Sequence, residues 1–370
     1  MADIFDLVDA LGPTRVVHVL EPGLGLRAVL VIDNVACGPA VGGLRMATDV
    51  SVGECARLAR AMTLKNAAAG LPHGGGKSVL WGDPRMPLER KERLVRAFAH
   101  ALRGEHDYIV GPDMGTDEQC MAWVHDEIGR AVGLPASIGG IPLDDIGATG
   151  WGLLHAAEVS APLCGFGLAG ARVVIQGFGA VGRHAARFLA ERGAVLVAAS
   201  DSTATLHVPT GIDVERLTAL KTAGQPLSHY AGGSILDRGA VIDIDCDIWI
   251  PAARPDVVDE VRAGRLKTKL MLQGANIPCT PEAERVLHER GVVVVPDFIA
   301  NAGGVICAAM ELRGATQAQV FQVIAEKVRA NVTAVLRDAG DHGEPPRAAA
   351  IRLAVARVTD AMRYARFGVM

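Results

Sequence analysis

Residues 172–201 read RVVIQGFGAVGRHAARFLAERGAVLVAASD, and this stretch decides the fold class of the chain. An apolar run leads into glycines spaced G-x-G-x-x-G, and an amphipathic stretch, a second apolar run and an acid follow. Strand, glycine turn, helix and strand in this order are typical of the first unit of a dinucleotide-binding fold. We therefore predict a Rossmann-type site here, with a plain glycine turn in another α/β unit as the alternative.

Each glycine of this motif has a separate task. Gly177 allows a tight turn, Gly179 lets a pyrophosphate approach the backbone, and Gly182 lets helix and strand pack closely. The helix that follows directs its free N–H groups and its positive dipole end at the phosphates. The expected binding loop consists of Gly177, Phe178, Gly179, Ala180, Val181 and Gly182.

Asp201 bears on which dinucleotide the chain binds. It follows the second apolar run, about where an acid can bond the two hydroxyl groups of the adenosine ribose. A carboxylate there would repel a 2′-phosphate, so we expect NAD as the cofactor. NADP is the alternative, because Ser200, Ser202 and Thr203 can hydrogen-bond a 2′-phosphate if Asp201 turns away.

Composition and charge exclude several classes of protein. The chain has 370 residues, 50% of them hydrophobic, which predicts two or three domains with sizeable cores. Its net charge of −4 offers no basic field for nucleic acid, and no apolar run is long enough for a membrane span. The seven cysteines contain no C-x-x-C pair and the first residues carry no basic leader, so we expect reduced thiols in a cytoplasmic protein.

The N-terminal part shows clear local patterns. Residues 52–68 read as a helix that starts at Ser51, with Glu54 three residues on as in a capping box. Residues 72–76 read as a glycine turn, and a short strand follows at 77–81.

The middle of the chain predicts a second domain. Residues 137–150 are rich in glycine and proline and form the expected linker. After the glycine motif, strand-like runs within 243–252, 269–276 and 291–297 alternate with helical stretches, which indicates a largely parallel, doubly wound sheet. We therefore expect an α/β protein with a first domain at residues 1–140 and a Rossmann-type dinucleotide-binding domain at 141–334.

Two lysines flank a run of glycines ahead of the linker. Gly74 to Gly76 lead into Lys77, and glycine removes side-chain bulk, so a small substrate and a crowded lysine can lie against the backbone. A lysine that loses solvent or lies near another cation, here Lys65, gives up its proton more easily and can act as a general base. Asp113 follows a predicted strand, where functional groups of α/β enzymes commonly lie.

Structural explanations stay open for each of these residues. Leu71 stands where a phosphate-binding G-x-x-x-x-G-K-[ST] loop needs glycine, which argues against that loop. Lys65 can complement a helix dipole, Asp113 can be a turn residue, and His73 can be a structural polar group. No group of His, Cys, Asp and Glu has the spacing of a metal site, so we expect no metal.

Seven motifs together resemble the glutamate/leucine/phenylalanine/valine dehydrogenase family. They are GPAVGGLRM (38–46), LARAMTLKNAAAGLPHGGGKSVLWGDP (58–84), GPDMGT (111–116), GATGWG (147–152), the glycine motif above, QGAN (273–276) and PDFIANAGGV (296–305). The resemblance implies NAD(P)-dependent oxidative deamination of an L-amino acid to a 2-oxo acid and ammonia. It also implies a homo-oligomer, a first domain that binds substrate and forms the oligomer, and a C-terminal helix (335–370) that returns to that domain.

The resemblance also assigns roles by position. Lys65 matches the lysine that holds the substrate α-carboxylate, Lys77 the catalytic lysine that activates water, and Asp113 the aspartate that shuttles protons. Thr149 and Asn276 match residues that position the nicotinamide end of the cofactor.

Two positions depart from the glutamate dehydrogenases of this family. Val41, before Gly42 and Gly43 in the implied substrate pocket, replaces a lysine, and Ala308 replaces a serine. Burial of a side-chain carboxylate against Val41 and Ala308 without a partner would be strongly unfavourable. We therefore expect an apolar substrate that is branched-chain, aromatic or methionine-like. Residues 200–300 resemble the glutamate branch more closely, so glutamate dehydrogenase is the alternative.

A non-catalytic dinucleotide-binding homologue is the second alternative. Loss of activity should first remove the lysines and the acid, but Lys65, Lys77 and Asp113 are all present. A dehydrogenase for hydroxy acids is a further competitor, yet it would not need two lysines around a glycine run.

Overall fold

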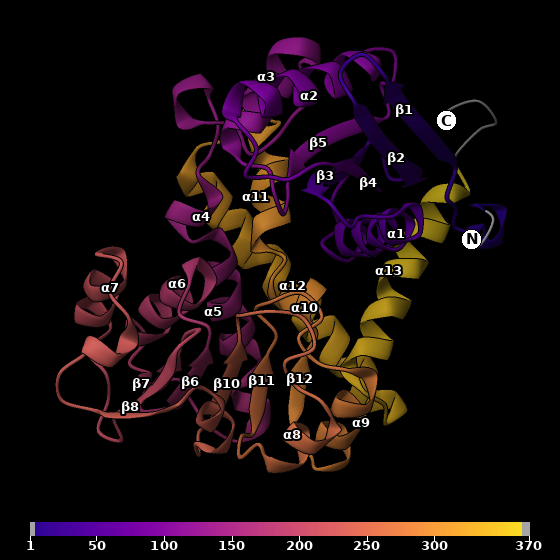
Figure 1. The fold of residues 1–370 in the computed structure, drawn as a ribbon. Coiled ribbons are helices and arrows are strands. Elements are labelled where there is room, and N and C mark those ends of the chain that lie inside the picture. The colour runs from indigo at the N-terminus through magenta and orange to yellow at the C-terminus, as the bar shows by residue number, and fades with distance from the viewer. Residues whose placement is uncertain (1–3, 365–370) are drawn as a thin grey trace. The chain divides into compact units, whose positions relative to one another are not determined.

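The structure is a computed structural model and describes residues 4–364. Contacts within the chain group it into two compact units (Figure 1). The first contains residues up to Pro142, Val305–Gln317 and those from Ile351 onward; the second contains Leu143–Gly304 and Ala318–Ala350. The expected two-part α/β fold is therefore confirmed, with C-terminal residues rejoining the first unit, while the domain boundaries at residues 140 and 334 stay a prediction.

The first unit is built on a mixed five-stranded sheet. The strand order is β1 (Arg15–Glu21), β2 (Leu26–Asn34), β4 (Gly74–Trp81), β3 (Ala40–Ala47) and β5 (Tyr108–Pro112). β2 is antiparallel to both β1 and β4, whereas β3 is parallel to β4 and β5. The carboxyl ends of β3 and β5 therefore meet at one edge, where the sequence analysis places Asp113.

Helices cover both faces of this sheet. On one face, Val29, Val31 and Val79 pack against Cys55 and Ala59 of α1 (Val52–Ala68). The other face packs against α2 (Leu88–Ala101) and α3 (Glu118–Ile128). The predicted start of α1 is confirmed, because the Ser51 side chain accepts a hydrogen bond of 3.1 Å from the Glu54 N–H.

The glycine run at 74–76 was expected as a turn, and that expectation is wrong. All three glycines lie inside β4, which begins at Gly74. A Cβ on Gly74 would lie 1.8 Å from the Asn34 carbonyl oxygen, and one on Gly75 would lie 2.0 Å from the Thr63 nitrogen. Close packing of β4 against β2 and α1, rather than a change of chain direction, therefore requires glycine here.

The second unit contains a seven-stranded sheet. Its order is β12 (Val293–Val295), β11 (Leu270–Leu272), β10 (Ile248–Pro251), β6 (Arg172–Gln176), β7 (Val195–Ser200), β8 (Ala204–His207) and β9 (Ser234–Asp237). The five strands from β12 to β7 are parallel, and β8 and β9 add an antiparallel edge. The parallel core was predicted; the two short edge strands after Asp201 were not.

Helices also cover both faces of the second sheet, as expected for a doubly wound fold. Val174, Trp249 and Met271 face α8 (Glu260–Arg265) and α9 (Pro281–Glu289) in one apolar cluster. Ile175 points the other way, toward Gly182 of α6 (Ala180–Ala190). α5 (Ala148–Ser160) packs beside α6.

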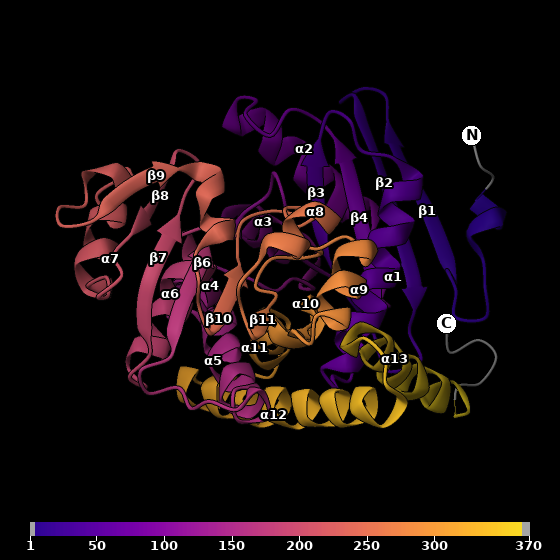
Figure 2. The ribbon, with the colours of Figure 1, turned by 90° about the horizontal axis from the view of Figure 1, so that it is seen from below.

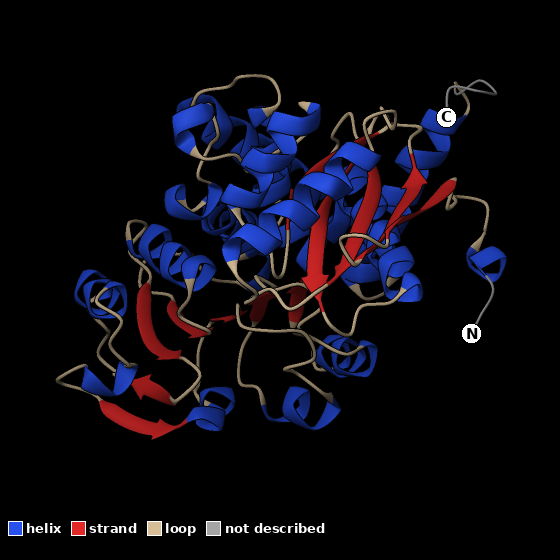
Figure 3. Ribbon diagram, turned by 45° about the horizontal axis from the view of Figure 1, so that its top comes forward, coloured by secondary structure: helices blue, strands red, loops and turns tan. Residues whose placement is uncertain are grey.

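A long helix, α12 (Gln317–His342), runs along α5 (Figure 2). The Trp151 indole N–H donates a 2.9 Å hydrogen bond to the Phe321 carbonyl, and the two rings stack 5.1 Å apart. The remaining α-helices are α4 (Leu143–Ile146), α7 (Val214–Thr222), α10 (Asp297–Ala300), α11 (Gly303–Glu311) and α13 (Pro346–Met362). Figure 3 colours helices blue and strands red. Within residues 4–364, no helix is both long and apolar enough to cross a membrane.

Glu311 joins α11 to the rest of the first unit. Its buried carboxylate accepts backbone hydrogen bonds from Gly133 (2.8 Å), Leu134 (3.3 Å) and Ile141 (2.8 Å). The Ile141 bond lies within the expected linker at 137–150, which also contains α4 and the first three residues of α5. One carboxylate thus satisfies three N–H groups of an otherwise irregular segment.

Glu311→Ala should lower the apparent free energy of unfolding by about 3 kcal/mol, because buried N–H groups lose their acceptor. Urea denaturation followed by fluorescence measures this. Glu289→Ala is the control, because the Glu289 side chain is 58% exposed and pairs with Arg285 on its own helix; it should change stability by less than about 0.5 kcal/mol. Equal effects of the two variants would contradict the anchoring role of Glu311.

Candidate functional site

The first unit brings Lys77 and Asp113 into direct contact. Lys77 lies on β4, and Asp113 directly follows β5. These two strands are the neighbours of β3 on either side of it in the sheet. The Lys77 Nζ lies 2.7 Å from the Asp113 Oδ2, and only 7% of the lysine side chain is exposed. Lys77 is therefore paired with a carboxylate. The role of Lys65 as a second cation beside it, or as an anchor for a substrate carboxylate, stays a prediction.

Arg45 is a member of this site that the sequence analysis did not single out. Its Nε donates to the Asp113 Oδ2 at 3.0 Å, and its Nη1 donates to Glu54 at 2.6 Å. Burial alone would raise the pKa of Asp113, but Lys77 and Arg45 outweigh burial and hold that pKa below its ordinary value. Asp113 is therefore a carboxylate at neutral pH. The position of Arg45 directly within the GPAVGGLRM motif was the signal that could have revealed it.

Gly43 makes the close approach of these groups possible. A Cβ on Gly43 would lie 2.7 Å from the Asp113 Cβ and 3.1 Å from the Lys77 Nζ. Gly42 is equally constrained, because a Cβ there would lie 1.7 Å from the Gly76 carbonyl oxygen. The Tyr108 hydroxyl fixes the same backbone by donating a 2.8 Å hydrogen bond to the Gly42 carbonyl. The glycine pair thus forms a bare backbone wall beside the ion pair.

The other expected substrate residues also lie in the first unit. Val41 is buried on β3, one residue before the glycine wall. Lys65 lies half-buried in the last turn of α1, and Ala308 lies half-buried on α11. His73 is buried, and its Nδ1 lies 3.3 Å from the Pro39 carbonyl, as expected of a structural polar group. The roles proposed for Lys65, Val41 and Ala308 stay predictions.

The glycine motif of the second unit has the geometry that a diphosphate needs. Gly177 adopts the left-handed φ of 95°, and a Cβ on Gly182 would lie 2.1 Å from the Gly177 carbonyl oxygen. α6 begins after Gly179 without any side-chain cap, and a Cβ on Gly179 would meet nothing within 4 Å. The first N–H groups of α6 therefore face open space, where phosphate oxygens can accept their hydrogen bonds.

A cavity of about 760 Å³ adjoins this loop. Its wall includes Gly177, Phe178, Gly179 and the segment 252–257. Its charged lining residues are Asp201, Lys221, Arg238, Arg254, Asp256 and Arg262. The excess of cations suits a ligand that carries phosphates, so the residues present fit a dinucleotide.

Asp201 is held by its own protein neighbours. Its Oδ2 accepts from the Lys221 Nζ at 2.8 Å and from the Leu227 N–H, while its Oδ1 accepts from both the N–H and the hydroxyl of Thr203. Burial alone would raise the pKa of Asp201, but Lys221 and Thr203 outweigh burial and place that pKa far below its ordinary value. An ion pair of Asp201 and Lys221, whose opposite charges cancel, therefore lies at the end of β7 in place of a lone carboxylate.

The residues expected at the nicotinamide end lie on two other segments. Thr149 is in the first turn of α5 and lies close to Gly304, because a Cβ added to Gly304 would be 3.3 Å from the Thr149 Oγ1. Asn276 is exposed, and its Oδ1 accepts a 2.9 Å hydrogen bond from the Asn301 side chain. Asn301 belongs to the PDFIANAGGV motif, so two of the quoted motifs meet at this bond.

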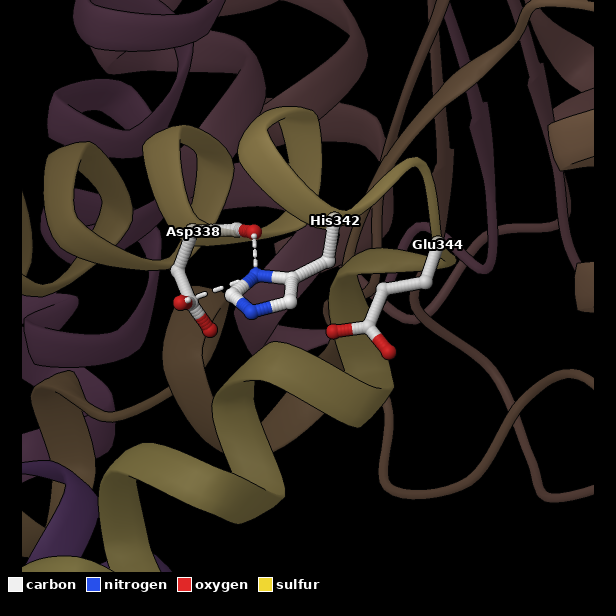
Figure 4. A group of neighbouring side chains, drawn as sticks. All are labelled: Asp338, His342 and Glu344. Atoms are coloured by element: carbon white, nitrogen blue, oxygen red, sulfur yellow. Dashed lines mark hydrogen bonds and ion pairs between the residues drawn. The ribbon is translucent and has the colours of Figure 1, made fainter.

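A group of possible metal ligands lies elsewhere in the second unit. Asp338, His342 and Glu344 bring three ligand atoms within 4.8 Å of one another, and Figure 4 shows the imidazole between the two carboxylates. The His342 Nδ1 lies 2.8 Å from the Asp338 carbonyl at the end of α12, and 56% of its side chain is exposed. A histidine that caps the carbonyl end of a helix accounts for this arrangement. The expectation of no metal stays a prediction.

Comparison with known proteins establishes the family. Residues 14–130 match the family "Glu/Leu/Phe/Val dehydrogenase, dimerisation domain", and residues 139–366 match "Glutamate/Leucine/Phenylalanine/Valine dehydrogenase". The chain belongs to this family. It is an NAD(P)-dependent amino-acid dehydrogenase that acts on the CH–NH₂ group, as its motifs indicated.

Named relatives and solved structures agree with this assignment. The chain is 40% identical to the NADP(+)-dependent glutamate dehydrogenase of Pyrobaculum calidifontis over 76% of this chain and 71% of the relative. It is 34% identical to the NAD-specific glutamate dehydrogenase of Staphylococcus aureus over 90% of this chain and 84% of the relative. The hetero-hexameric glutamate dehydrogenase of Thermus thermophilus, in its Leu-bound form, superposes with a TM-score of 0.82 at 31% identity, covering 96% of this chain and 91% of that one.

Lys77→Ala should lower turnover by roughly 100-fold or more, because it removes the amine that faces Asp113. Cofactor binding should be almost unchanged, because the dinucleotide cavity is lined by residues of the second unit. Steady-state kcat and NADH fluorescence titration measure the two effects. Retention of more than about a tenth of wild-type turnover at saturating substrate would remove Lys77 from the catalytic centre.

Proposed function

We propose that the chain catalyses the reversible oxidative deamination of L-glutamate to 2-oxoglutarate. The ion pair of Lys77 and Asp113 beside the glycine wall carries the proposal for the reaction class. The glutamate dehydrogenases among its relatives support glutamate as the substrate. The balanced reaction is L-glutamate, NAD(P)⁺ and water giving 2-oxoglutarate, NH₄⁺, NAD(P)H and a proton.

The residues of the first unit would perform the proton transfers. Bound NAD(P) supplies the hydride acceptor for the substrate Cα. Asp113 would first take the ammonium proton of Lys77. The freed Lys77 amine then takes a proton from the water that attacks the resulting imine carbon, and Asp113 passes its proton to the leaving nitrogen, which restores the ion pair. The two groups share a hydrogen bond of 2.7 Å, so a proton given to one can be passed to the other. Gly42 and Gly43 leave room for substrate against the backbone.

An apolar amino acid is the second candidate substrate, and Val41 favours it. Val41 is 8% exposed and lies next to the glycine wall, at the position where the family resemblance implies a lysine in glutamate-specific members. If Val41 faces the substrate side chain, a glutamate carboxylate needs a cation from another part of the chain. An unpaired carboxylate there would be penalised far more than a poorly fitting methylene group.

We further propose that the chain accepts both NAD and NADP. The carboxylate of Asp201 is neutralised by Lys221, so its repulsion of a 2′-phosphate is weakened. Lys221 and Arg238 line the same cavity and offer positive charge for that phosphate. Relatives that bear the printed names NAD-specific and NADP(+)-dependent are consistent with this proposal.

A cytoplasmic homo-oligomer is the assembly that we propose. The match to a dimerisation domain at residues 14–130 and the hexameric relative support an oligomer. The seven cysteines are all free thiols, which suits a reducing compartment.

Val41→Lys should raise the ratio of kcat/KM for glutamate over leucine by about tenfold or more, because a cation is added where the side-chain carboxylate would lie. Val41→Leu is the control for size without charge. The wild-type values for glutamate, leucine, phenylalanine and methionine, measured under one condition, choose between the two candidates. An unchanged ratio in Val41→Lys would mean that residue 41 does not face the substrate side chain.

Lys221→Met should lower the ratio of kcat/KM for NADP over NAD by about tenfold, since it exposes the charge of Asp201 and removes a phosphate partner. Arg216→Met on the same helix is the control, because Arg216 stacks on Tyr230 and is absent from the cavity wall. An unchanged cofactor ratio would mean that another group decides the choice.

A further inference from the structure

Arg347 lies in the first turn of α13 and binds three acidic or amide side chains of the second unit. Its Nε donates to the Glu284 Oε2 at 2.7 Å, and its Nη2 donates to the Gln273 Oε1 at 2.8 Å. The same Nη2 lies 2.9 Å from the Asp297 Oδ1. These partners come from α9, from the end of β11 and from the start of α10. One guanidinium therefore joins three separate segments.

The acceptors of Arg347 are buried and bonded to one another. Gln273 is 0% exposed, Glu284 6% and Asp297 5%. The Gln273 Nε2 donates to Glu284 at 2.7 Å, and the Asp297 N–H donates to the Gln273 Oε1 at 3.0 Å. Two buried carboxylates lie against one cation, and without that cation their charges would repel each other in a site that excludes water. The arrangement of Gln273 and Asp297 thus depends on Arg347.

Asp297 in turn holds an unfavourable backbone turn. Its Oδ2 accepts a 2.8 Å hydrogen bond from the Ile277 N–H. Ile277 has a φ of 41°, a left-handed conformation that β-branched residues rarely adopt. The Ile277 carbonyl accepts a 3.0 Å bond from the N–H of Asp256, whose φ of 53° is also left-handed. Such conformations persist only where neighbouring groups hold them.

This turn carries residues of the cofactor site. Asp256 lines the dinucleotide cavity, within the wall segment 252–257. Asn276, expected at the nicotinamide end, directly precedes Ile277. Asn301 donates both to the Asn276 Oδ1 and, at 3.3 Å, to the Gly274 carbonyl. A displacement of Ile277 would therefore move both Asn276 and Asp256.

We propose that Arg347 is a positioning residue for the cofactor site, which acts through Asp297 on the turn at Ile277. Arg347 has no contact with the dinucleotide cavity; it sets the conformation of the groups that form its wall. The inference rests on the proposed use of NAD(P) by this chain. It explains why a side chain from the start of the last helix is bonded into the QGAN and PDFIANAGGV motifs.

Arg347→Lys tests the proposal, because lysine keeps the charge but cannot bond Glu284, Gln273 and Asp297 together. We expect the Kd for NADH and NADPH to rise by about tenfold, with a matching rise in the cofactor KM. The amino-acid KM at saturating cofactor should change by less than about twofold. Arg290→Lys is the matched control: Arg290 donates to the carbonyls of Ala263 and Leu266 in the same unit, away from the turn. It should lower thermal stability without changing the cofactor Kd.

A second substitution separates positioning from general stability. Ile277→Gly removes the left-handed penalty, and Ile277 is 53% exposed, so the change leaves the core intact. In the Arg347→Lys background, Ile277→Gly should restore cofactor affinity by roughly fivefold, since the turn no longer needs to be held. A purely structural role of Arg347 predicts no such recovery. If Arg347→Lys does not fold, Asp297→Asn weakens the same link and should raise the cofactor Kd.

A raised cofactor Kd with recovery by Ile277→Gly supports the proposal. A raised cofactor Kd without that recovery shows a purely structural role of Arg347 and overturns the proposal. A cofactor Kd unchanged in Arg347→Lys and in Asp297→Asn, while the wild-type chain binds NADH or NADPH, overturns the positioning role alone. Failure of the wild-type chain to bind either dinucleotide overturns the proposed function and, with it, this inference.

Discussion

The contact of Lys77 with Asp113 is the interaction on which the rest of the site depends. Lys77 lies on β4, whereas Asp113 follows β5. The buried ammonium of Lys77 is tolerable because the Asp113 carboxylate lies 2.7 Å away. Their approach requires a backbone without side chains, which Gly43 provides. Arg45 completes the charge balance of Asp113 and links it to Glu54 at the start of α1. The sheet order and the glycines therefore serve one chemical requirement, a lysine and an acid held together beside an open wall.

Long periodic patterns predicted the fold well. The helix at 52–68 with its Ser51 cap and the β-α-β unit at 172–201 appear where the sequence placed them. Three short strands were not predicted. β8 and β9 have four residues each, and β3 has eight residues with two glycines in its middle, so none shows a clear alternating pattern. The run Gly74–Gly76 looked like a turn for the same reason: glycine serves close packing as well as chain reversal, and only the tertiary contacts distinguish the two.

Motif positions predicted the candidate site better than they predicted its electrostatics. The resemblance gave Lys77 and Asp113 separate roles, and their direct contact was not predicted. Asp201 was expected to bond the adenosine ribose, and nothing in the sequence indicated its partner Lys221, which lies 20 residues further along the chain on α7. Arg347 lies 50 residues after Asp297 in the sequence, and Asp297 is the residue that connects it to the turn at Ile277. Partners so distant in sequence leave no local signal, and a single chain offers no spacing rule that would reveal them.

A double-mutant cycle on Lys77 and Asp113 tests the central claim most directly. The single-turnover rate of 2-oxo acid formation is measured for the wild-type chain, Lys77→Met, Asp113→Asn and the double variant, all at saturating cofactor. If the two residues act as one proton-transfer unit, the double variant should be about as slow as the slower single variant. Losses that multiply, so that the double variant is slower by the product of the two single effects, would show that the residues act independently and would contradict this account.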